Sequence, residues 1–441
     1  MKKTLTLITA GADAPDPLSV SAYESVGGFK GLKKALTMTP AEIVREVLAA
    51  KLLGRGGAAY PAGKKWEQLL KIPRGPKYVV ANADEGEPGT FKDRLIMDKV
   101  PFGLLEGMAV AGHVFGARNG YVYVRGEYRL IGKKLRAAIE TLKAAGRLGE
   151  NILGSGFSFD VKVVSGAGAY VCGENSALLN STEGKAGRPR IKPPHLAEVG
   201  LFLKPTLVNN VETFACVPSI VAEGGERFLS LGHPEGGGTK LVCLSGRVKN
   251  PGVYEIPLGR LTLRELIFDP ELGGGMREGD VFNFAHLGGQ SGPIAGIAGL
   301  DAVYAHSELK KASLAVGSGA IVVMDRSVGI LDYLRRVSEF FAGESCGKCV
   351  PCREGNGTIL RYLKTLEDGE AGPEELRALS LLAETMARAS FCGLGQAAPT
   401  ALESARKIFP EEFEGRVRRP EDAEVREAPH PTKFGDSAAT A

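Results

Sequence analysis

Four cysteines have the clearest chemistry in this sequence. Cys346, Cys349 and Cys352 follow one another with two residues between each pair, and Cys392 lies further along the chain. A short loop with this spacing directs three thiols at one volume, as in proteins that hold a cubane iron–sulfur cluster. Four thiolates also suit zinc. The residues alone therefore predict a metal centre and leave iron and zinc open.

A glycine-rich loop, Gly54-Arg55-Gly56-Gly57, has the character of a phosphate site. Its unhindered N–H groups can line a nest for an anion, and Arg55 and Lys65 can neutralise the charge. The loop contains Gly-x-Gly-x-x-Ala but follows a predicted helix, so the strand context of a dinucleotide fingerprint is missing. The alternative is a helix stop and turn, for which one glycine would suffice.

Three polar segments follow predicted strands or open predicted helices. Residues 82–89 carry three carboxylates, which suit acid–base work, a magnesium site or hydrogen bonds to a ligand; the alternative is a solvated acidic turn. Glu174 could bind a nucleotide ribose, or its carboxylate could simply be stabilised by the dipole of the helix that begins there. Residues 209–213 could contact a phosphate or ribityl chain or merely cap a helix.

The elements that must position these residues fall into three groups. Strands and helices alternate as far as a predicted linker at 234–238, which favours an α/β layer architecture. A small α+β module follows, and helices dominate from about residue 330, with the cysteines predicted in loops at their ends. The expected strands are 78–81, 120–124, 159–164, 240–245, 252–256 and 320–324, and the expected helices are 39–53, 103–115, 130–145, 263–268, 331–341, 358–366, 373–389 and 400–409.

Composition narrows the class of protein. The 441 residues predict two to four domains, and 44% hydrophobic with 24% charged residues is typical of a globular protein. A net charge of +4 over this length argues against nucleic-acid binding. Seven cysteines, three of them in one loop, indicate a reducing compartment. The sequence has no uncharged apolar stretch long enough for direct membrane insertion, and its start is not taken for a signal peptide.

Together the segments 54–63, 82–94, 166–174, 209–213 and 344–355 resemble one family, over roughly residues 35 to 412. It is the NADH-binding flavoprotein subunit of respiratory complex I, with the related diaphorase subunits of soluble NAD-linked hydrogenases, formate dehydrogenases and bifurcating complexes. The resemblance implies a Rossmann-like FMN and NADH domain, a ubiquitin-like β-grasp domain and a four-helix bundle that binds one [4Fe–4S] cluster. The expected limits are an N-terminal extension at 1–38, these domains at 39–235, 236–328 and 329–415, and a disordered tail at 416–441.

The family's site residues carry over to matching positions of this sequence. Cys346, Cys349, Cys352 and Cys392 would ligate the cluster. The residues expected to bind FMN are Gly54, Arg55, Gly56, Gly57, Lys65, Asn82, Asp84, Glu85, Tyr170, Gly173, Asn209, Asn210 and Thr213. Those expected to contact NADH are Tyr60, Glu87, Glu174, Asn175 and Phe202.

The resemblance implies hydride transfer from NADH to FMN and single-electron transfer to the cluster. The expected partners are a thioredoxin-like [2Fe–2S] subunit and a larger iron–sulfur subunit of complex I, which would place the chain in the cytoplasm at the inner membrane face. A soluble diaphorase is the alternative, and a zinc-bound assembly protein is a further one. Asn175 replaces a glutamate common in relatives, so NADH selectivity over NADPH is left open, and Gln68 stands where an aromatic residue is common.

Overall fold

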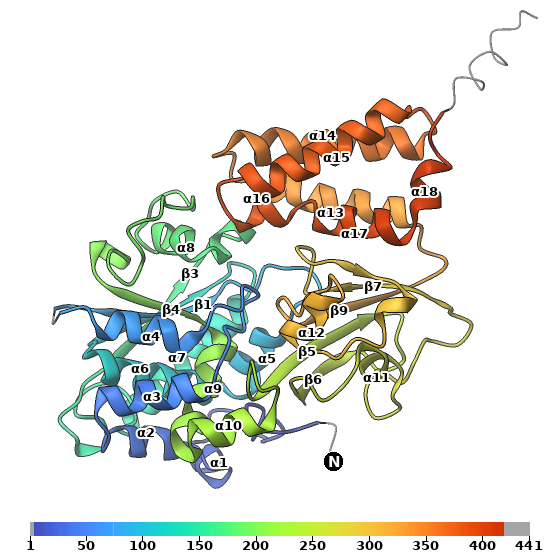
Figure 1. The fold of residues 1–441 in the computed structure, drawn as a ribbon. Helices are drawn as coiled ribbons and strands as arrows, with labels where there is room; N and C mark the ends of the chain where they lie inside the picture. The colour runs from blue at the N-terminus through green and yellow to red at the C-terminus, as the bar shows by residue number, and fades with distance from the viewer. Residues whose placement is uncertain (1–3, 74, 419–441) are drawn as a thin grey trace, which may run out of the picture.

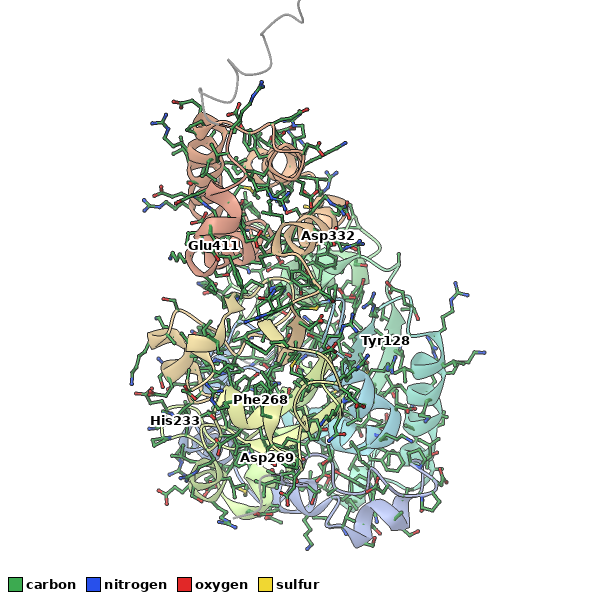
Figure 2. The ribbon with its side chains drawn as sticks, turned by 90° about the vertical axis from the view of Figure 1, so that its right-hand side faces the viewer. Tyr128, His233, Phe268, Asp269, Asp332 and Glu411 are labelled. Atoms are coloured by element: carbon green, nitrogen blue, oxygen red, sulfur yellow. The ribbon has the colours of Figure 1, made fainter. Side chains whose placement is uncertain are left out.

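A computed structural model describes residues 4–73 and 75–418 and shows three units (Figure 1). An α/β unit with a parallel sheet comes first, a mixed sheet follows, and a helical unit lies at the opposite end. Figure 2 marks the three with Tyr128 in the first, Phe268 and Asp269 in the second, and Asp332 and Glu411 in the third. Most of the predicted tail, residues 419–441, lies outside the described residues.

The first unit is built on a parallel sheet with the strand order β3-β2-β1-β4. Its strands are β1 (Tyr78–Ala83), β2 (Asn119–Val124), β3 (Asp160–Ser165) and β4 (Thr206–Asn210). The carboxyl ends of β1 and β4 are neighbours, since Asn82 pairs with Asn210. In open α/β sheets ligands bind outside the carboxyl ends of the strands, so this pairing brings two of the predicted segments to one edge.

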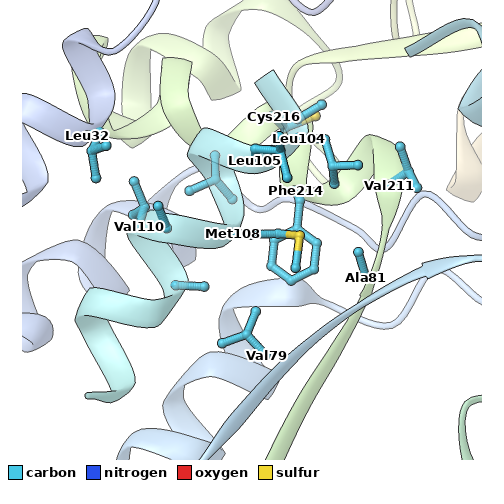
Figure 3. Packing of buried hydrophobic residues seen from close by; sticks show 14 of the residues in the cluster. Leu32, Val79, Ala81, Leu104, Leu105, Met108, Val110, Val211, Phe214 and Cys216 are labelled. Carbon is cyan, nitrogen blue, oxygen red and sulfur yellow. The ribbon is translucent and has the colours of Figure 1, made fainter. Parts of the chain in front are cut away.

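Helices cover this sheet, and their buried side chains form a hydrophobic core together with those of the strands. The helices are α3 (Pro40–Ala49), α4 (Ala62–Leu70), α5 (Lys92–Lys99), α6 (Pro101–Phe115), α7 (Arg129–Ala144), α8 (Asn175–Thr182), α9 (Val211–Glu223) and α10 (Gly225–Leu231). The predicted start of α3 is confirmed by a capping box at Thr39, but the helix ends at Ala49, short of residue 53. Figure 3 shows part of the core, where Val79 of β1, Met108 of α6 and Phe214 of α9 come together.

Two helices absent from the sequence prediction, α1 (Val20–Ser25) and α2 (Lys30–Ala35), pack on the first unit. The buried carboxylate of Glu106 accepts hydrogen bonds from Phe29 N and Leu32 N, each at 2.9 Å, and from Tyr23 Oη at 2.7 Å. The described part of the expected N-terminal extension therefore contributes to the core of this unit.

The second unit is a mixed sheet with the order β6-β5-β9-β7-β8. Its strands are β5 (Thr239–Gly246), β6 (Gly252–Pro257), β7 (Phe282–Leu287), β8 (Ile294–Ala295) and β9 (Ala320–Asp325), and its helices are α11 (Leu263–Phe268) and α12 (His306–Lys311). The predicted α11 has the observed bounds. The sequence prediction did not include β7 and β8. β7 pairs with β9, which lies much further along the chain, so this pairing leaves no local pattern in the sequence.

The third unit is helical. Its helices are α13 (Ile330–Glu344), α14 (Val350–Glu367), α15 (Pro373–Ala389), α16 (Gly393–Ala397), α17 (Thr400–Ile408) and α18 (Pro410–Glu414). The prediction began α14 at residue 358, whereas the helix begins at Val350 with Pro351 in its first turn. Proline is well tolerated there because the first N–H groups of a helix have no partner inside it. Cys352 consequently lies on this helix, which corrects its predicted place in a loop. Short 3₁₀ turns occupy Ile152–Gly154, Tyr170–Gly173, Leu201–Leu203 and Ile297–Gly299.

Candidate functional site

The glycine-rich loop lies against the amino end of α9. Arg55 N donates to Thr213 Oγ1 at 2.9 Å, which fixes the two predicted phosphate segments to each other. Gly57 has a φ of 116°, a conformation that disfavours side chains, and a Cβ on Gly56 would lie 3.1 Å from Asn210 Cβ. The backbone path therefore favours glycine at position 57, and close packing favours it at position 56.

Arg55 is almost fully buried, with 1% of its surface exposed. Its Nη2 donates to Gly237 O at 2.7 Å, while Nε and Nη1 find no acceptor among the described residues. Buried donors without partners are costly, and an anion would satisfy them. This chemistry fits the phosphate of FMN.

The loop after β1 faces the turn that precedes α8. Asn82 Nδ2 donates to Gly173 O at 2.8 Å and to Asn175 Oδ1 at 3.1 Å. Asp84 Oδ2 is buried and has no donor among the described residues. Burial raises the pKa of Asp84 to about 7, with a smaller opposing effect from Arg125. A buried acceptor of this kind suits the polar edge of a flavin ring.

The side chain of Glu85 is already occupied. Its two oxygens accept from Asp93 N at 2.7 Å and Arg94 N at 2.9 Å, and Tyr128 Oη lies 3.2 Å from Oε2. The carboxylate thus caps the amino end of α5 and leaves the backbone of Glu85 for any ligand contact. Burial raises the pKa of Glu85 to about 7 despite these donors.

The residues at the end of β4 are tied into the fold in different ways. The Asn209 amide is placed to accept from Trp66 Nε1 at 3.0 Å and to donate to Val208 O at 3.1 Å. Asn210 caps α9 through Glu212 N, at 2.9 Å, and its Nδ2 donates to Asp93 Oδ2 at 2.6 Å. The amino end of α9, a position that favours anions, lies against the glycine-rich loop through Thr213.

A buried ion network beneath these loops was not predicted. Lys92 Nζ lies 2.7 Å from Asp93 Oδ1 and 3.0 Å from Glu212 Oε2, and Lys240 Nζ lies 2.7 Å from Glu212 Oε2. All four side chains are at most 4% exposed. Lys92, Asp93 and Glu212 fall inside the motifs described above, so their positions were a usable signal. Lys240 could be suspected only as a charged residue within an apolar strand.

Tyr60, one of the side chains expected to contact NADH, lies near Lys65, and Glu174, another, pairs with Lys192. Lys65 Nζ lies 5.9 Å from the centroid of the Tyr60 ring, and Lys192 Nζ pairs with Glu174 Oε1 at 2.8 Å. Burial, together with the nearby positive charge of Lys192, lowers the pKa of Lys65 to about 8. Lys192 was missed because it lies in a loop without a recognisable motif. Two cations, of which only Lys192 is paired here with a carboxylate, favour an anionic ligand.

Glu87 links this region to the second unit. Its Oε1 accepts from Ser291 N at 2.7 Å, in the loop between β7 and β8, and burial raises its pKa. Glu174 also caps α8, since Oε2 accepts from Ser176 N at 2.9 Å and Ala177 N at 3.0 Å. Its outer oxygen, Oε1, is the one that meets Lys192.

Phe202 lies beside the amino end of β1. Its ring packs on Tyr78, with 5.8 Å between the centroids. Its backbone N donates to Glu183 Oε1 at 2.8 Å, and Glu183 follows the last residue of α8, the helix that Glu174 caps. The contact of Phe202 with NADH stays a prediction.

The four predicted cysteines line one small pocket, shared with Val171 and Pro189 of the first unit. Weak donors face the sulfurs: Phe391 N lies 3.4 Å from Cys349 Sγ, and Asn356 Nδ2 lies 3.4 Å from Cys352 Sγ. Such donors stabilise thiolate ligands and tune a cluster. The donor set fits an iron–sulfur cluster.

Four thiols around one pocket suit zinc as well as a cubane cluster, so the side chains alone leave both open.

The segment 170–174 joins the two sites. Val171 lines the cysteine pocket, while the Tyr170 ring packs on Phe340 of α13, with 5.1 Å between centroids. Tyr170 N donates to Glu344 Oε2 at 2.9 Å, and Glu344 lies two residues before Cys346. The turn that contributes Gly173 and Glu174 to the first site is thus in direct contact with the second.

Two family descriptions match the chain. Residues 47–219 match the Nuo51 FMN-binding domain, and residues 332–416 match the NADH-ubiquinone oxidoreductase-F iron-sulfur binding region. The F 2 subunit of NADH-quinone oxidoreductase in Rhizobium meliloti (strain 1021) is 44% identical over 92% of this chain and 96% of its own length. The chain belongs to the family of NADH-quinone oxidoreductase F subunits. This confirms the predicted family, with FMN and a [4Fe–4S] cluster as its cofactors and NADH as its substrate.

Related hydrogenase subunits are also similar to this chain. The NADP-reducing hydrogenase subunit HndC of Solidesulfovibrio fructosivorans is 42% identical over 94% of this chain and 84% of its own length. The crystal structure of an NAD+-reducing [NiFe]-hydrogenase in the H2-reduced state superposes with a TM-score of 0.82 at 32% identity, covering 96% of this chain and 70% of that one. This similarity confirms the predicted α/β fold with a parallel sheet.

None of the helices in the described part of the chain is both long and apolar enough to cross a bilayer.

Proposed function

We propose that this chain is the NADH-oxidising subunit of a multisubunit NADH:quinone oxidoreductase. When bound, FMN accepts a hydride from NADH and the [4Fe–4S] cluster takes electrons singly. The contact of the segment 170–174 with both the Asn82–Glu87 loop and the cysteine pocket carries the proposal, because it connects the two cofactor sites directly.

The chain's own residues have distinct roles in this proposal. Gly54 to Gly57 and the amino end of α9 bind the FMN phosphate, with Arg55 supplying two buried N–H groups. Asn82 and Asp84 orient the flavin ring, together with the backbone of Glu85 and the turn at Tyr170 and Gly173. Lys65 neutralises phosphate charge.

Tyr60, Glu87 and Glu174 hold NADH against this ring, and Lys192 supplies positive charge beside them. Alignment of the two rings and exclusion of water are the protein's contribution to the rate. Asn175 is neutral and accepts from Asn82, so it presents no charge that would repel the extra phosphate of NADPH.

The other two units have supporting roles. We assign residues 236–328 to a β-grasp domain, on the basis of its mixed five-stranded sheet, and residues 329–415 to a four-helix bundle around the cysteines. A one-electron outlet requires an acceptor, for which we propose a [2Fe–2S] thioredoxin-like subunit and a larger iron–sulfur subunit. In such a complex the chain would lie in the cytoplasm, at the inner face of the membrane.

A diaphorase subunit of a soluble NAD(P)-linked hydrogenase is the second candidate, favoured by the similarity to HndC and to the NAD+-reducing hydrogenase. Co-purification of a tagged chain from its source distinguishes the two. Membrane pump subunits among the partners support the first candidate, and a hydrogenase subunit supports the second.

An anaerobic visible spectrum of the purified holoprotein, with iron and flavin quantified, tests the shared chemistry. NADH should bleach both the flavin band and the broad iron–sulfur absorbance. Holoprotein that contains both groups and is unchanged by NADH or NADPH would contradict the proposal. Bleaching by NADPH as well would show that Asn175 has relaxed the selectivity.

A further inference from the structure

Lys240 is a fully buried lysine in strand β5 of the second unit, a place where charged side chains are rare. Its Nζ donates to Glu212 Oε2 and to Leu241 O, each at 2.7 Å. Leu241 N donates to the other oxygen, Glu212 Oε1, at 2.9 Å. Two adjacent residues of the second unit therefore hold both oxygens of one carboxylate in the first unit.

The fold provides space for this contact. Gly319, at the start of β9, has a φ of 101°, and a Cβ there would lie 2.6 Å from Lys240 Nζ. A side chain at this position would displace the lysine. The buried ammonium is thus accommodated by the backbone of its own sheet.

Glu212 lies at the phosphate end of the flavin site. It is the second residue of α9, between Asn210, which caps the helix, and Thr213, which accepts from Arg55 N. A carboxylate held at both oxygens fixes how the first turn of α9 is rotated. The N–H groups at that end and the glycine-rich loop bound to Thr213 are then fixed as well.

Lys92 closes the network on the other side. Its Nζ meets Glu212 Oε2 at 3.0 Å and Asp93 Oδ1 at 2.7 Å, and Asp93 Oδ2 accepts from Asn210 Nδ2 at 2.6 Å. Glu212 is therefore balanced between lysines of two different units. Without Lys240, Lys92 would be the only lysine on the carboxylate, opposed on the β5 side by the Leu241 N–H group alone, and would draw it toward α5.

We propose that Lys240 is a positioning residue for the FMN phosphate, acting through Glu212 on the amino end of α9. The inference rests on the proposed assignment of residues 54–57 and 209–213 to that phosphate. It makes the second unit part of the flavin site, although the lysine itself reaches the flavin only through another side chain.

The test compares FMN with riboflavin, which lacks the phosphate. Dissociation constants are measured by flavin fluorescence on holoprotein stripped of flavin with its cluster intact. In Lys240→Met we expect the FMN constant to rise about tenfold or more, the worth of a charge-assisted hydrogen bond, and the riboflavin constant to stay near that of the unaltered protein. Lys249→Met, an exposed lysine after the same strand, is the matched control and should change neither.

A second variant covers the case in which Lys240→Met does not fold. Lys240→Met with Glu212→Gln removes both charges, so no carboxylate is left short of a partner, and it should also lose the preference for FMN. Retention of that preference in either folded variant overturns the inference. Equal weakening of FMN and riboflavin also overturns it, because a merely structural lysine would act on both flavins.

The unaltered protein separates this inference from the assignment beneath it. If it binds FMN no more tightly than riboflavin, the phosphate assignment in the proposed function fails, and the inference fails with it. If it prefers FMN and Lys240→Met keeps that preference, the role of Lys240 alone is wrong.

Discussion

Charged side chains have different roles in the flavin site and in the helical unit around the cysteines. Beneath the flavin loops Lys92 and Glu212 form an ion pair whose side chains are 1% and 0% exposed. On the helical unit the pair Arg377 and Glu374 is 71% and 80% exposed. When one partner of a buried pair is removed, the other is left as an uncompensated buried charge. When one partner of an exposed pair is removed, water solvates the charge that remains.

The two proposed cofactor sites also depend on different kinds of contact. We propose that the four cysteines of the pocket bind one cluster directly, so the cluster depends on four side chains. The flavin site is assembled from four stretches of the first unit and one strand of the second, joined by buried hydrogen bonds. We therefore expect single substitutions to abolish the cluster locally, and to damage the flavin site through residues that touch no ligand.

Removal of one cluster ligand has the largest expected effect. In Cys352→Ser a hydroxyl replaces a soft thiolate, so iron content and the low-temperature electron paramagnetic resonance signal of the reduced cluster should fall to baseline. Bound FMN should stay at the level of the unaltered protein, because Cys352 belongs to the helical unit. Both contents are measured on the same preparation.

Cys216→Ala is the control for that experiment, since Cys216 is buried in the core of the first unit. It should keep its iron. Full iron content in Cys352→Ser would show that this cysteine is not a ligand, and loss of FMN along with the iron would show that the two sites are not independent.

Loss of Lys92 has the next largest expected effect. Lys92→Met leaves Asp93 without its cation and Glu212 with only Lys240, which should lower the free energy of unfolding by about 3–5 kcal/mol. FMN should be lost while iron is retained. Trp66, the only tryptophan, lies in the core of the first unit and reports the unfolding of that unit by its fluorescence.

Two variants sharpen that result. Adding Asp93→Asn to Lys92→Met should recover part of the lost stability, because it removes one stranded charge. Glu374→Gln, which breaks the exposed pair on the helical unit, should leave unfolding unchanged. Equal effects of Lys92→Met and Glu374→Gln would remove the distinction between the two regions.

The contrast also explains what could be predicted from the sequence. Ligand identity and spacing are local, so the cysteine motif predicted a pocket that the fold does assemble, and the Thr39 capping box predicted where α3 begins. Lys240 carries only the local signal of a charged residue within an apolar strand, and Lys192 carries none. Each becomes informative only through a carboxylate distant in the chain, Glu212 for one and Glu174 for the other.

Some element boundaries were missed for related physical reasons. The glycines, Pro351 and cysteines near the start of α14 resemble a loop, yet a proline in the first turn costs a helix little. Glu85 was expected to bind the flavin. Its carboxylate caps α5 and leaves its backbone for that contact, so the binding stays a prediction. A side chain near a ligand site and a side chain that caps a helix have the same signature in a sequence.

The smallest expected effect is a pH dependence of FMN binding through Lys65. Its pKa, about 8 in the free site, is below the usual 10.5 because of burial and the charge of Lys192. A bound phosphate favours the protonated form and raises that pKa, so binding takes up a proton near pH 8. Since the protonated fraction falls about tenfold from pH 7 to pH 9, FMN affinity should fall by up to about tenfold, or about 1.4 kcal/mol.

Titration calorimetry at pH 8 in two buffers of different ionisation enthalpy measures that proton uptake, and fluorescence titrations at pH 7 and pH 9 measure the affinity. Lys65→Met should bind FMN weakly at both pH values, and its affinity should not fall between pH 7 and pH 9. We call that fall the step. Lys64→Met, at the exposed neighbouring position, should keep it. A step that persists in Lys65→Met would have to come from another group. Asp84 and Glu85, with pKa values of about 7, are the alternative titrating groups. A carboxylate that ionises beside the flavin also weakens phosphate binding as pH rises, but its step would be centred near pH 7, so the midpoint identifies the group.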